Sequence, residues 1–155
     1  MTQRPGDSDN PKSTGKTYLG FDFGLRRIGV AVGQSLLNSA RPVRTLTANA
    51  GAPDWDAVAD LIKEWNPAAL IVGLPYNMDG SKQQLTEQAQ RFARQLAGRF
   101  KCDVHMVDER LTSDAAAATL KDLRRQGKRG RIDKADIDSM AAKLILEIWL
   151  EQKHS

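Results

Sequence analysis

Hydrophobic and polar positions in the first third of the chain alternate as they do in short β-strands separated by turns. Thr17 to about Asp22 has the pattern of one strand, and Ile28 to Gly33 has that of a second. The turn between them contains Gly24, so the two strands are predicted to form a β-hairpin. A third strand is expected over Val43 to Thr47, which would complete a three-strand meander.

Three later segments carry apolar residues at the spacing of an amphipathic helix. The first helix is expected to open at Pro53 and to end before Asn66 and Pro67. Ser81 with Gln84 predicts a capping box at the start of the second helix. The last helix should run from Lys134 to about Gln152. The predicted apolar faces are Trp55, Val58, Leu61, Ile62 and Trp65; Leu85, Ala89, Phe92, Ala93 and Leu96; and Ile137, Ala141, Leu144, Ile145 and Ile148.

Two more strands lie between these helices. Ala69 to Val72 is a continuous apolar run, typical of a strand buried on both faces, and Asp103 to Val107 is the fifth strand. A shorter helix capped by Thr112 is expected from Ala115 to Leu123.

This order of elements predicts an α/β fold. Its mixed five-stranded sheet would combine the three-strand antiparallel meander with two parallel strands, with helices on both faces. The polar residues 1–16 are expected to be a disordered tail, and residues 17–152 a single domain.

Composition supports a soluble folded protein. Hydrophobic residues make up 41% of the 155 residues and charged ones 27%, close to ordinary globular usage. No apolar run is long enough to span a membrane, and the N-terminus is polar where a signal peptide would be apolar, so a cytoplasmic protein without a membrane partner is expected. The single cysteine, Cys102, cannot form an internal disulfide, and no Cys or His cluster has zinc-ligand spacing.

Positive charge is concentrated in one stretch. Seven basic and two acidic residues lie between Lys121 and Lys134, a net +5 against +4 for the whole chain. Because this stretch contains glycines and few apolar residues, residues 124–131 are expected to form a mobile, exposed loop that grips a nucleic-acid backbone. The candidate phosphate contacts are Arg124, Arg125, Lys128, Arg129 and Arg131. A merely solvated basic loop is the alternative, and the absence of interleaved aromatic residues argues against base stacking.

Acidic residues follow two of the predicted strands and open the last helix. Asp22 ends the first strand, Asp108 and Glu109 follow the fifth, and Asp136 and Asp138 lie near the helix start. If the first and fifth strands are neighbours in the sheet, one acid from each and one from the helix would converge. Clustered carboxylates need a cation, and Mg²⁺ or Mn²⁺ suits oxygen ligands; two such ions could drive phosphodiester cleavage. The alternative is that these acids are ordinary caps and solvated charges.

A second candidate site lies in the loop from Gly73 to Ser81. Asn77, Gly80 and Ser81 precede a helix N-terminus, where backbone N–H groups suit a phosphate, although a purely structural turn would use the same residues. Arg110 could reach a phosphate or pair with Asp108, whose side chain should point away from that of Glu109.

Four sequence blocks resemble the YqgF family of RNase H-like proteins. They are YLGFDFGLRRIGVAVG (18–33), VGLPYNMDGS (72–81), VDERLTSDAAA (107–117) and IDSMAAKLILE (137–147). The resemblance implies an RNase H-like fold in which Asp22, Glu109 and Asp138 bind one or two Mg²⁺ or Mn²⁺ ions and are catalytic. Asp136 has no counterpart in the family block, and Leu25 stands where the family often has a small hydroxyl residue.

The resemblance also implies a function. Members of this family are described as Holliday junction resolvases and as nucleases that mature the small-subunit ribosomal RNA precursor. The expected activity is therefore metal-dependent endonucleolytic hydrolysis at the 5′ end of pre-16S rRNA, with the ribosome as a further partner. The alternatives are Holliday junction resolution, which implies a homodimer in place of a monomer, and a protein that binds RNA, ribosome or transcription machinery without cleavage.

Overall fold

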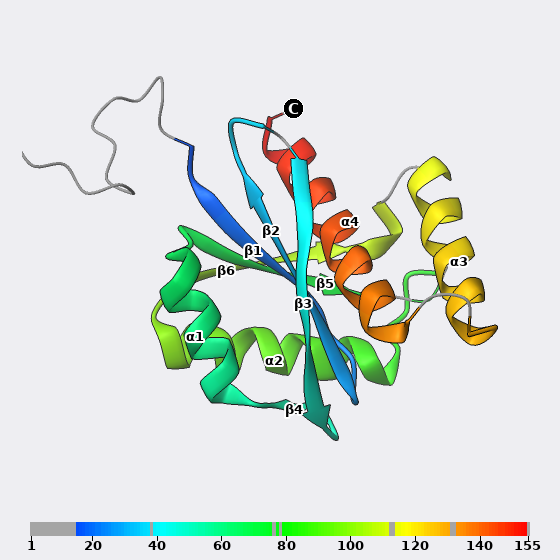
Figure 1. Cartoon of the computed structure of the whole chain (residues 1–155), viewed down its shortest axis with the longest axis horizontal. Helices are drawn as coiled ribbons and strands as arrows, with labels where there is room; N and C mark the ends of the chain where they lie inside the picture. The colour runs from blue at the N-terminus through cyan, green and yellow to red at the C-terminus, as the bar shows by residue number, and fades with distance from the viewer. Residues whose placement is uncertain are drawn as a thin grey trace, which may run out of the picture.

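The computed structural model describes residues 15–37, 39–75, 77, 79–111, 114–130 and 133–154 (Figure 1). Residues 1–14 of the expected tail and Thr112, the expected helix cap, lie outside this part of the chain. Lys16, assigned to the tail, exchanges backbone and side-chain hydrogen bonds with Ser35 at the end of the first hairpin.

One mixed sheet organises the molecule. Its strand order is β4-β3-β2-β1-β5-β6. The strands are β1 (Thr17–Asp22), β2 (Arg27–Gln34), β3 (Ser39–Asn49), β4 (Ala52–Pro53), β5 (Ala69–Leu74) and β6 (Asp103–Asp108). β1, β2 and β3 pair antiparallel, whereas β5 runs parallel to β1 and β6 parallel to β5. The predicted meander and parallel pair are confirmed.

The sixth strand, β4, was not predicted. It is only two residues long and pairs with the end of β3 across a tight turn in which Ala50 and Gly51 both have positive φ, 51° and 87°. Such a short pairing leaves no alternation in the sequence to detect.

Helices cover both faces of the sheet. Figure 1 shows α1 (Trp55–Trp65) and α2 (Gln84–Phe100) on one face and α4 (Lys134–His154) across the other, with α3 (Asp114–Lys128) beside α4. Two helix starts differ from expectation. Pro53 belongs to β4 and Asp54 caps α1, accepting from the N–H groups of Asp56 and Ala57. The N-cap of α2 is Gln83, not Ser81, and its capping-box partner is Thr86, whose Oγ1 accepts the Gln83 N–H at 2.9 Å.

Two hydrophobic cores sit on opposite faces of the sheet, as the alternation along β1 dictates. Leu19 and Phe21 face α1 and α2, whose predicted apolar faces are confirmed, and Tyr18 faces α4. Gly20 also faces α4, where its missing side chain lets Leu146 approach.

The stripe of α4 that packs on the sheet is rotated from the predicted one. Ile137, Ala141 and Ile145 are buried as expected, but Ala142, Leu146 and Leu150 are buried in place of Leu144 and Ile148, which are only partly covered. Apolar residues surround most of this helix, so periodicity alone could not select the face.

The basic stretch is largely helical, which corrects the prediction of a mobile loop. α3 continues through Lys128, and Gly130, with φ of 73°, follows its end. Gly127 is buried within this helix and does not end it. Among the described residues, no helix has the length and apolar character needed to cross a bilayer.

Candidate active site

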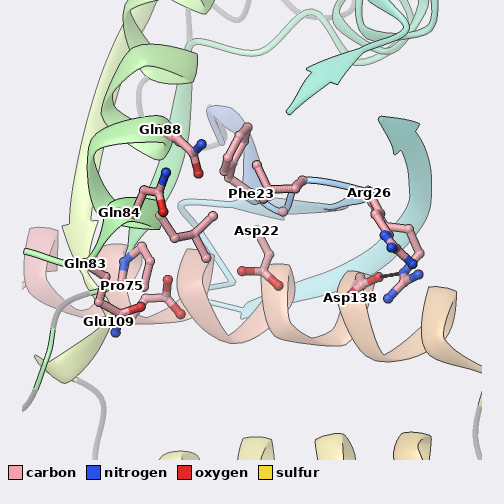
Figure 2. A pocket seen from close by; sticks show the side chains of 13 residues that line it. Asp22, Phe23, Arg26, Pro75, Gln83, Gln84, Gln88, Glu109 and Asp138 are labelled. Atoms are coloured by element: carbon pink, nitrogen blue, oxygen red, sulfur yellow. Dashed lines mark hydrogen bonds and ion pairs between the residues drawn. The ribbon is translucent and has the colours of Figure 1, made fainter. Parts of the chain in front are cut away.

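The three predicted acidic ligands line one open pocket of about 760 Å³. Asp22 is the last residue of β1, where it pairs with Gly29 of β2, and its side chain is partly buried. In the view of Figure 2, Asp22 lies between Glu109 and Asp138. The remaining wall comes from Phe23, Gly24, Leu25, Arg26, Arg27, Pro75, Gln83, Gln84, Leu85 and Gln88.

Glu109 reaches this pocket by a different route from the one expected. β6, which precedes it, is not a neighbour of β1, because β5 lies between them. β5 ends at Leu74, is followed by Pro75 and contributes no acid of its own. The 3-10 turn η1 (Glu109–Leu111) follows β6 directly, and Glu109 at its start lines the pocket with Pro75. The condition that the first and fifth predicted strands are neighbours is therefore not met, yet Asp22, Glu109 and Asp138 line the same pocket.

Asp138 is held in place by the docking of α4 on β2 and β3. A Cβ built on Gly29 would lie 1.9 Å from the Asp138 carbonyl oxygen, so the two backbones approach as only glycine allows. Thr45 Oγ1 on β3 donates to the Ala135 carbonyl one turn earlier in α4. The Asp138 carboxylate accepts a hydrogen bond from Arg27 Nε, 2.7 Å from Oδ2, in a partly buried ion pair.

Asp108 and Asp136, the other acidic residues near the predicted ligands, do not line the pocket. Asp136 is exposed in the first turn of α4. Asp108 pairs with Arg110, whose Nη2 lies 2.7 Å from Oδ2, and it also accepts the Arg110 backbone N–H at 2.9 Å. These bonds hold the pKa of the Asp108 carboxyl below its usual value. The ion-pair alternative for Arg110 is therefore confirmed.

The second candidate site forms a turn outside the pocket. Asn77 Nδ2 donates to Ser81 Oγ at 2.9 Å, and Ser81 donates from both its N–H and its hydroxyl to Asp79 Oδ1. The Ser81 bonds also lower the pKa of Asp79. Because α2 begins at Gln84, Ser81 is not at the helix N-terminus as predicted. Gly80, with φ of 91°, faces Arg110, so the turn and the Asp108–Arg110 pair are adjacent.

Sequence reasoning missed the cationic and amide side chains of the pocket. Arg26 in the β1–β2 turn and Arg27 at the start of β2 line the pocket, and Gln83, Gln84 and Gln88 contribute from the start of α2. Figure 2 shows Arg26 on the side of the pocket opposite Glu109. Thr86 fixes that helix start by donating to the Pro75 carbonyl. The sequence signal that could have identified the two arginines is their position shortly after Asp22, the acid at the end of the first strand.

The basic side chains of the 121–134 stretch that the structure describes lie outside the pocket lining. Arg125, Lys128 and Arg129 are exposed on the last turns of α3 and just after it. The side chain of Arg124 and the whole of Arg131 lie outside the described part of the structure. This charge immediately precedes α4, the helix that carries Asp138.

The chemistry of the pocket fits a hard divalent cation. Its three carboxylates offer oxygen ligands, and Asp138 already balances a positive charge, that of Arg27. Within the described ranges, no three acidic, His or Cys side chains are grouped tightly enough to form a metal cluster. A cation held by all three carboxylates would therefore require their side chains to move closer together.

A family model described as "RuvX: Holliday junction resolvase" matches residues 16–152, which is nearly the whole chain. The chain belongs to the RuvX family. Proteins named "Putative pre-16S rRNA nuclease" are among its relatives. One from Legionella pneumophila (strain Philadelphia 1) is 53% identical over 135 residues, covering 87% of this chain and 95% of the relative. Another, from Aeromonas salmonicida, is 45% identical over 139 residues, 90% of this chain and 97% of the relative.

Solved structures place this RuvX chain among RNase H-like resolvase folds. Thermus thermophilus RuvC in complex with a Holliday junction substrate has a TM-score of 0.54 at 16% identity, covering 90% of this chain and 96% of that one. The yeast mitochondrial Holliday junction resolvase has a TM-score of 0.52 at 12% identity, covering 88% and 78%. At these identities the likeness establishes the RNase H-like fold, as predicted.

Proposed function

We propose that the chain is a metal-dependent nuclease that hydrolyses phosphodiester bonds at this pocket. The observation that carries the proposal is the arrival of Asp22, Glu109 and Asp138 at one pocket from three separate elements, β1, η1 and α4. Carboxylates gathered on a surface that meets a polyanion would repel it unless a cation lies between them. A binding protein without catalysis has no use for this arrangement, which disfavours that alternative.

Each residue has a defined part in the proposed reaction. Asp22, Glu109 and Asp138 would hold one or two Mg²⁺ or Mn²⁺ ions, which would supply Lewis acidity toward a phosphate and activate water. Gln84 and Gln88 can donate amide N–H groups to a strand lying in the pocket. Arg125, Lys128 and Arg129 would hold the flanking backbone, and Arg124 and Arg131 extend this charge along the sequence.

Precursor small-subunit ribosomal RNA is the proposed substrate. Relatives that are 45% and 53% identical over most of the chain are named for that substrate. Cleavage would be endonucleolytic, at the 5′ end of the precursor, in the cytoplasm and in association with assembling ribosomes. The turn formed by Asn77, Gly80 and Ser81, with Arg110 beside it, is proposed as a secondary phosphate contact because its polar groups are exposed next to the Glu109 segment.

Holliday junction resolution is the second candidate. The description of the family model and the fold of junction-bound RuvC favour it. Symmetric cutting of two strands would require a homodimer, whereas processing of one RNA end can be carried out by a monomer. The two candidates therefore differ in substrate and in the stoichiometry of the active complex.

The deciding experiment offers both substrates to the same enzyme. Purified protein is incubated with end-labelled pre-16S RNA or a labelled four-way DNA junction, each with Mn²⁺ or with EDTA. Cation-dependent cleavage of the RNA at discrete sites is expected, with the junction left intact. Preferential cutting of the junction would assign the protein to the second candidate, and binding of either substrate without cutting would overturn the nuclease proposal.

Asp22→Asn is the matched control because it keeps the shape of the side chain and removes one charge. We expect it to abolish cleavage while its melting curve without metal stays near that of the wild type. Mn²⁺ should raise the melting temperature of the wild type, since it binds only the folded state, and Asp22→Asn should lose most of this shift. Equal shifts in both proteins would place the cation elsewhere.

A further inference from the structure

One contact in the pocket competes with the proposed cation. Arg27, at the start of β2, donates from Nε to Asp138 Oδ2 at 2.7 Å, across 111 residues of sequence. The carboxylate of Asp138 is 22% exposed, so it is partly removed from water and its positive partner matters more than at a free surface. The carboxylate that would bind a divalent cation is therefore already neutralised by a guanidinium.

A guanidinium and a divalent cation on the same carboxylate repel each other at short range. Ligation of a cation by Oδ2 would thus require Arg27 to leave. Arg27 has room to do so, because its side chain is 39% exposed and lines the open pocket.

We propose that Arg27 is a placeholder for the cation: it neutralises Asp138 in the metal-free protein and is displaced when a divalent ion binds. The inference rests on the proposed function, since it requires Asp138 to be a ligand. Arg27 is a positioning residue in this scheme. Its pair holds the carboxylate at the pocket and at the same time lowers the affinity of the site for the cation.

The alternative is that the pair only fastens α4 to the sheet. The structure argues against this, because α4 is already fixed there by the close approach of Gly29 to the Asp138 backbone and by the hydrogen bond from Thr45 to Ala135. The buried residues Ala142, Ile145 and Leu146 add hydrophobic packing along the same helix. These contacts would hold α4 on the sheet without the partly buried ion pair.

Arg26 provides a matched control for charge. It lines the same pocket one residue earlier, and within the described part of the chain it forms no ion pair with a carboxylate. Arg26→Gln and Arg27→Gln each remove one positive charge from the same pocket, so both should strengthen Mn²⁺ binding by lowering the electrostatic repulsion of the cation. Only Arg27→Gln also removes the competitor from Asp138.

The test is calorimetric titration of the full chain with MnCl₂, without nucleic acid. Relative to Arg26→Gln, Arg27→Gln should bind Mn²⁺ about two- to fivefold more tightly, the range typical of a partly exposed ion pair. Arg27→Lys keeps the charge but loses the Nε donor, so its affinity should fall between those of the wild type and Arg27→Gln. It also keeps the test informative if Arg27→Gln folds poorly.

The outcomes separate the two proposals. Equal Mn²⁺ affinities for Arg27→Gln and Arg26→Gln, with binding still abolished in Asp22→Asn, would overturn the placeholder role and leave the cation site standing. Binding that is absent from the wild type, or unchanged in Asp22→Asn, would overturn the cation site itself. Arg27→Lys that binds more tightly than Arg27→Gln would also contradict displacement.

Discussion

Asp136 and Asp138 both belong to the start of α4, but only Asp138 lines the pocket. Successive helix positions point about 100° apart, so Asp136 and Asp138, two positions apart, point in different directions. We expect Asp138→Asn to lower the cleavage rate by orders of magnitude and Asp136→Asn to change it little. Single-turnover cleavage of labelled RNA at saturating Mn²⁺ measures both. The reverse ranking would assign the ligand to Asp136.

Asp108 is a structural carboxylate, and its role can be checked by acid titration. Arg110 lowers the pKa of Asp108 from 3.8, so the charged form is stabilised in the folded protein. This stabilisation is present above the unfolded pKa and disappears as the pH falls through the lower, folded value. For a pair so close to the surface it contributes about 1 kcal/mol or less.

Asp108→Asn keeps an acceptor for the Arg110 N–H and removes the charge. Urea unfolding should show wild type more stable than this variant by a constant margin at neutral pH. The margin should shrink as the pH falls below 3.8, the ordinary pKa of the group. A margin that widened on acidification would contradict the assigned pair.

At the scale of elements, hydrophobic periodicity predicted the buried face of each helix that is apolar on one side and polar on the other. α1 and α2 show one apolar face each, and both faces pack as expected. α4 is apolar on several sides, and tertiary contacts with Gly20 and Gly33 of the sheet selected its buried stripe. The sequence does not reveal the helical course of residues 124–128, because clustered charge and glycine are also typical of loops, although Arg, Lys and Gln are good helix formers.

The contact between Gly29 and α4 is the element-level feature on which Asp138 depends. Gly29→Ala would place a methyl group against the helix backbone, which cannot yield as a flexible side chain can. We expect unfolding free energy to fall by about 2–3 kcal/mol and Mn²⁺ affinity to weaken as α4 shifts. Gly98→Ala is the control, because nothing lies within 4 Å of its new Cβ in α2, and it should be neutral or stabilising. A Gly29→Ala protein as stable as wild type would show that α4 docks more loosely.

At the scale of the whole molecule, the acids could be identified from sequence but their arrangement could not. Strand ends and the family blocks selected Asp22, Glu109 and Asp138, whereas local patterns carry no information on strand order, and β5 separates β1 from β6. Arg27 was missed for the same reason, because its partner lies 111 residues away and only the packing of α4 on β2 brings them together. Long-range pairings of this kind are decided by the fold.

The distribution of charge over the molecule predicts how binding and chemistry divide. Arg125, Lys128 and Arg129, the described basic residues at the end of α3 and just after it, lie outside the pocket lining, so we expect this basic stretch to supply affinity without contributing to the chemical step. Neutralising Arg124, Arg125, Lys128, Arg129 and Arg131 to Gln preserves helix propensity in α3. Binding should weaken similarly for all sequences, because phosphate contacts carry no base information.

Salt dependence gives the decisive measurement. The slope of log affinity against log salt should become shallower by about 0.7 to 0.9 for each phosphate that the variant no longer neutralises, several units for the five-residue variant. Arg125→Gln with Lys128→Gln should lower it by up to about two units, while the matched pair Lys63→Gln and Arg94→Gln, on exposed positions of α1 and α2, should leave it unchanged. Cleavage at saturating substrate should survive in every variant. An unchanged slope would show that the basic residues are merely solvated, and normal binding without cleavage would place them in the active site.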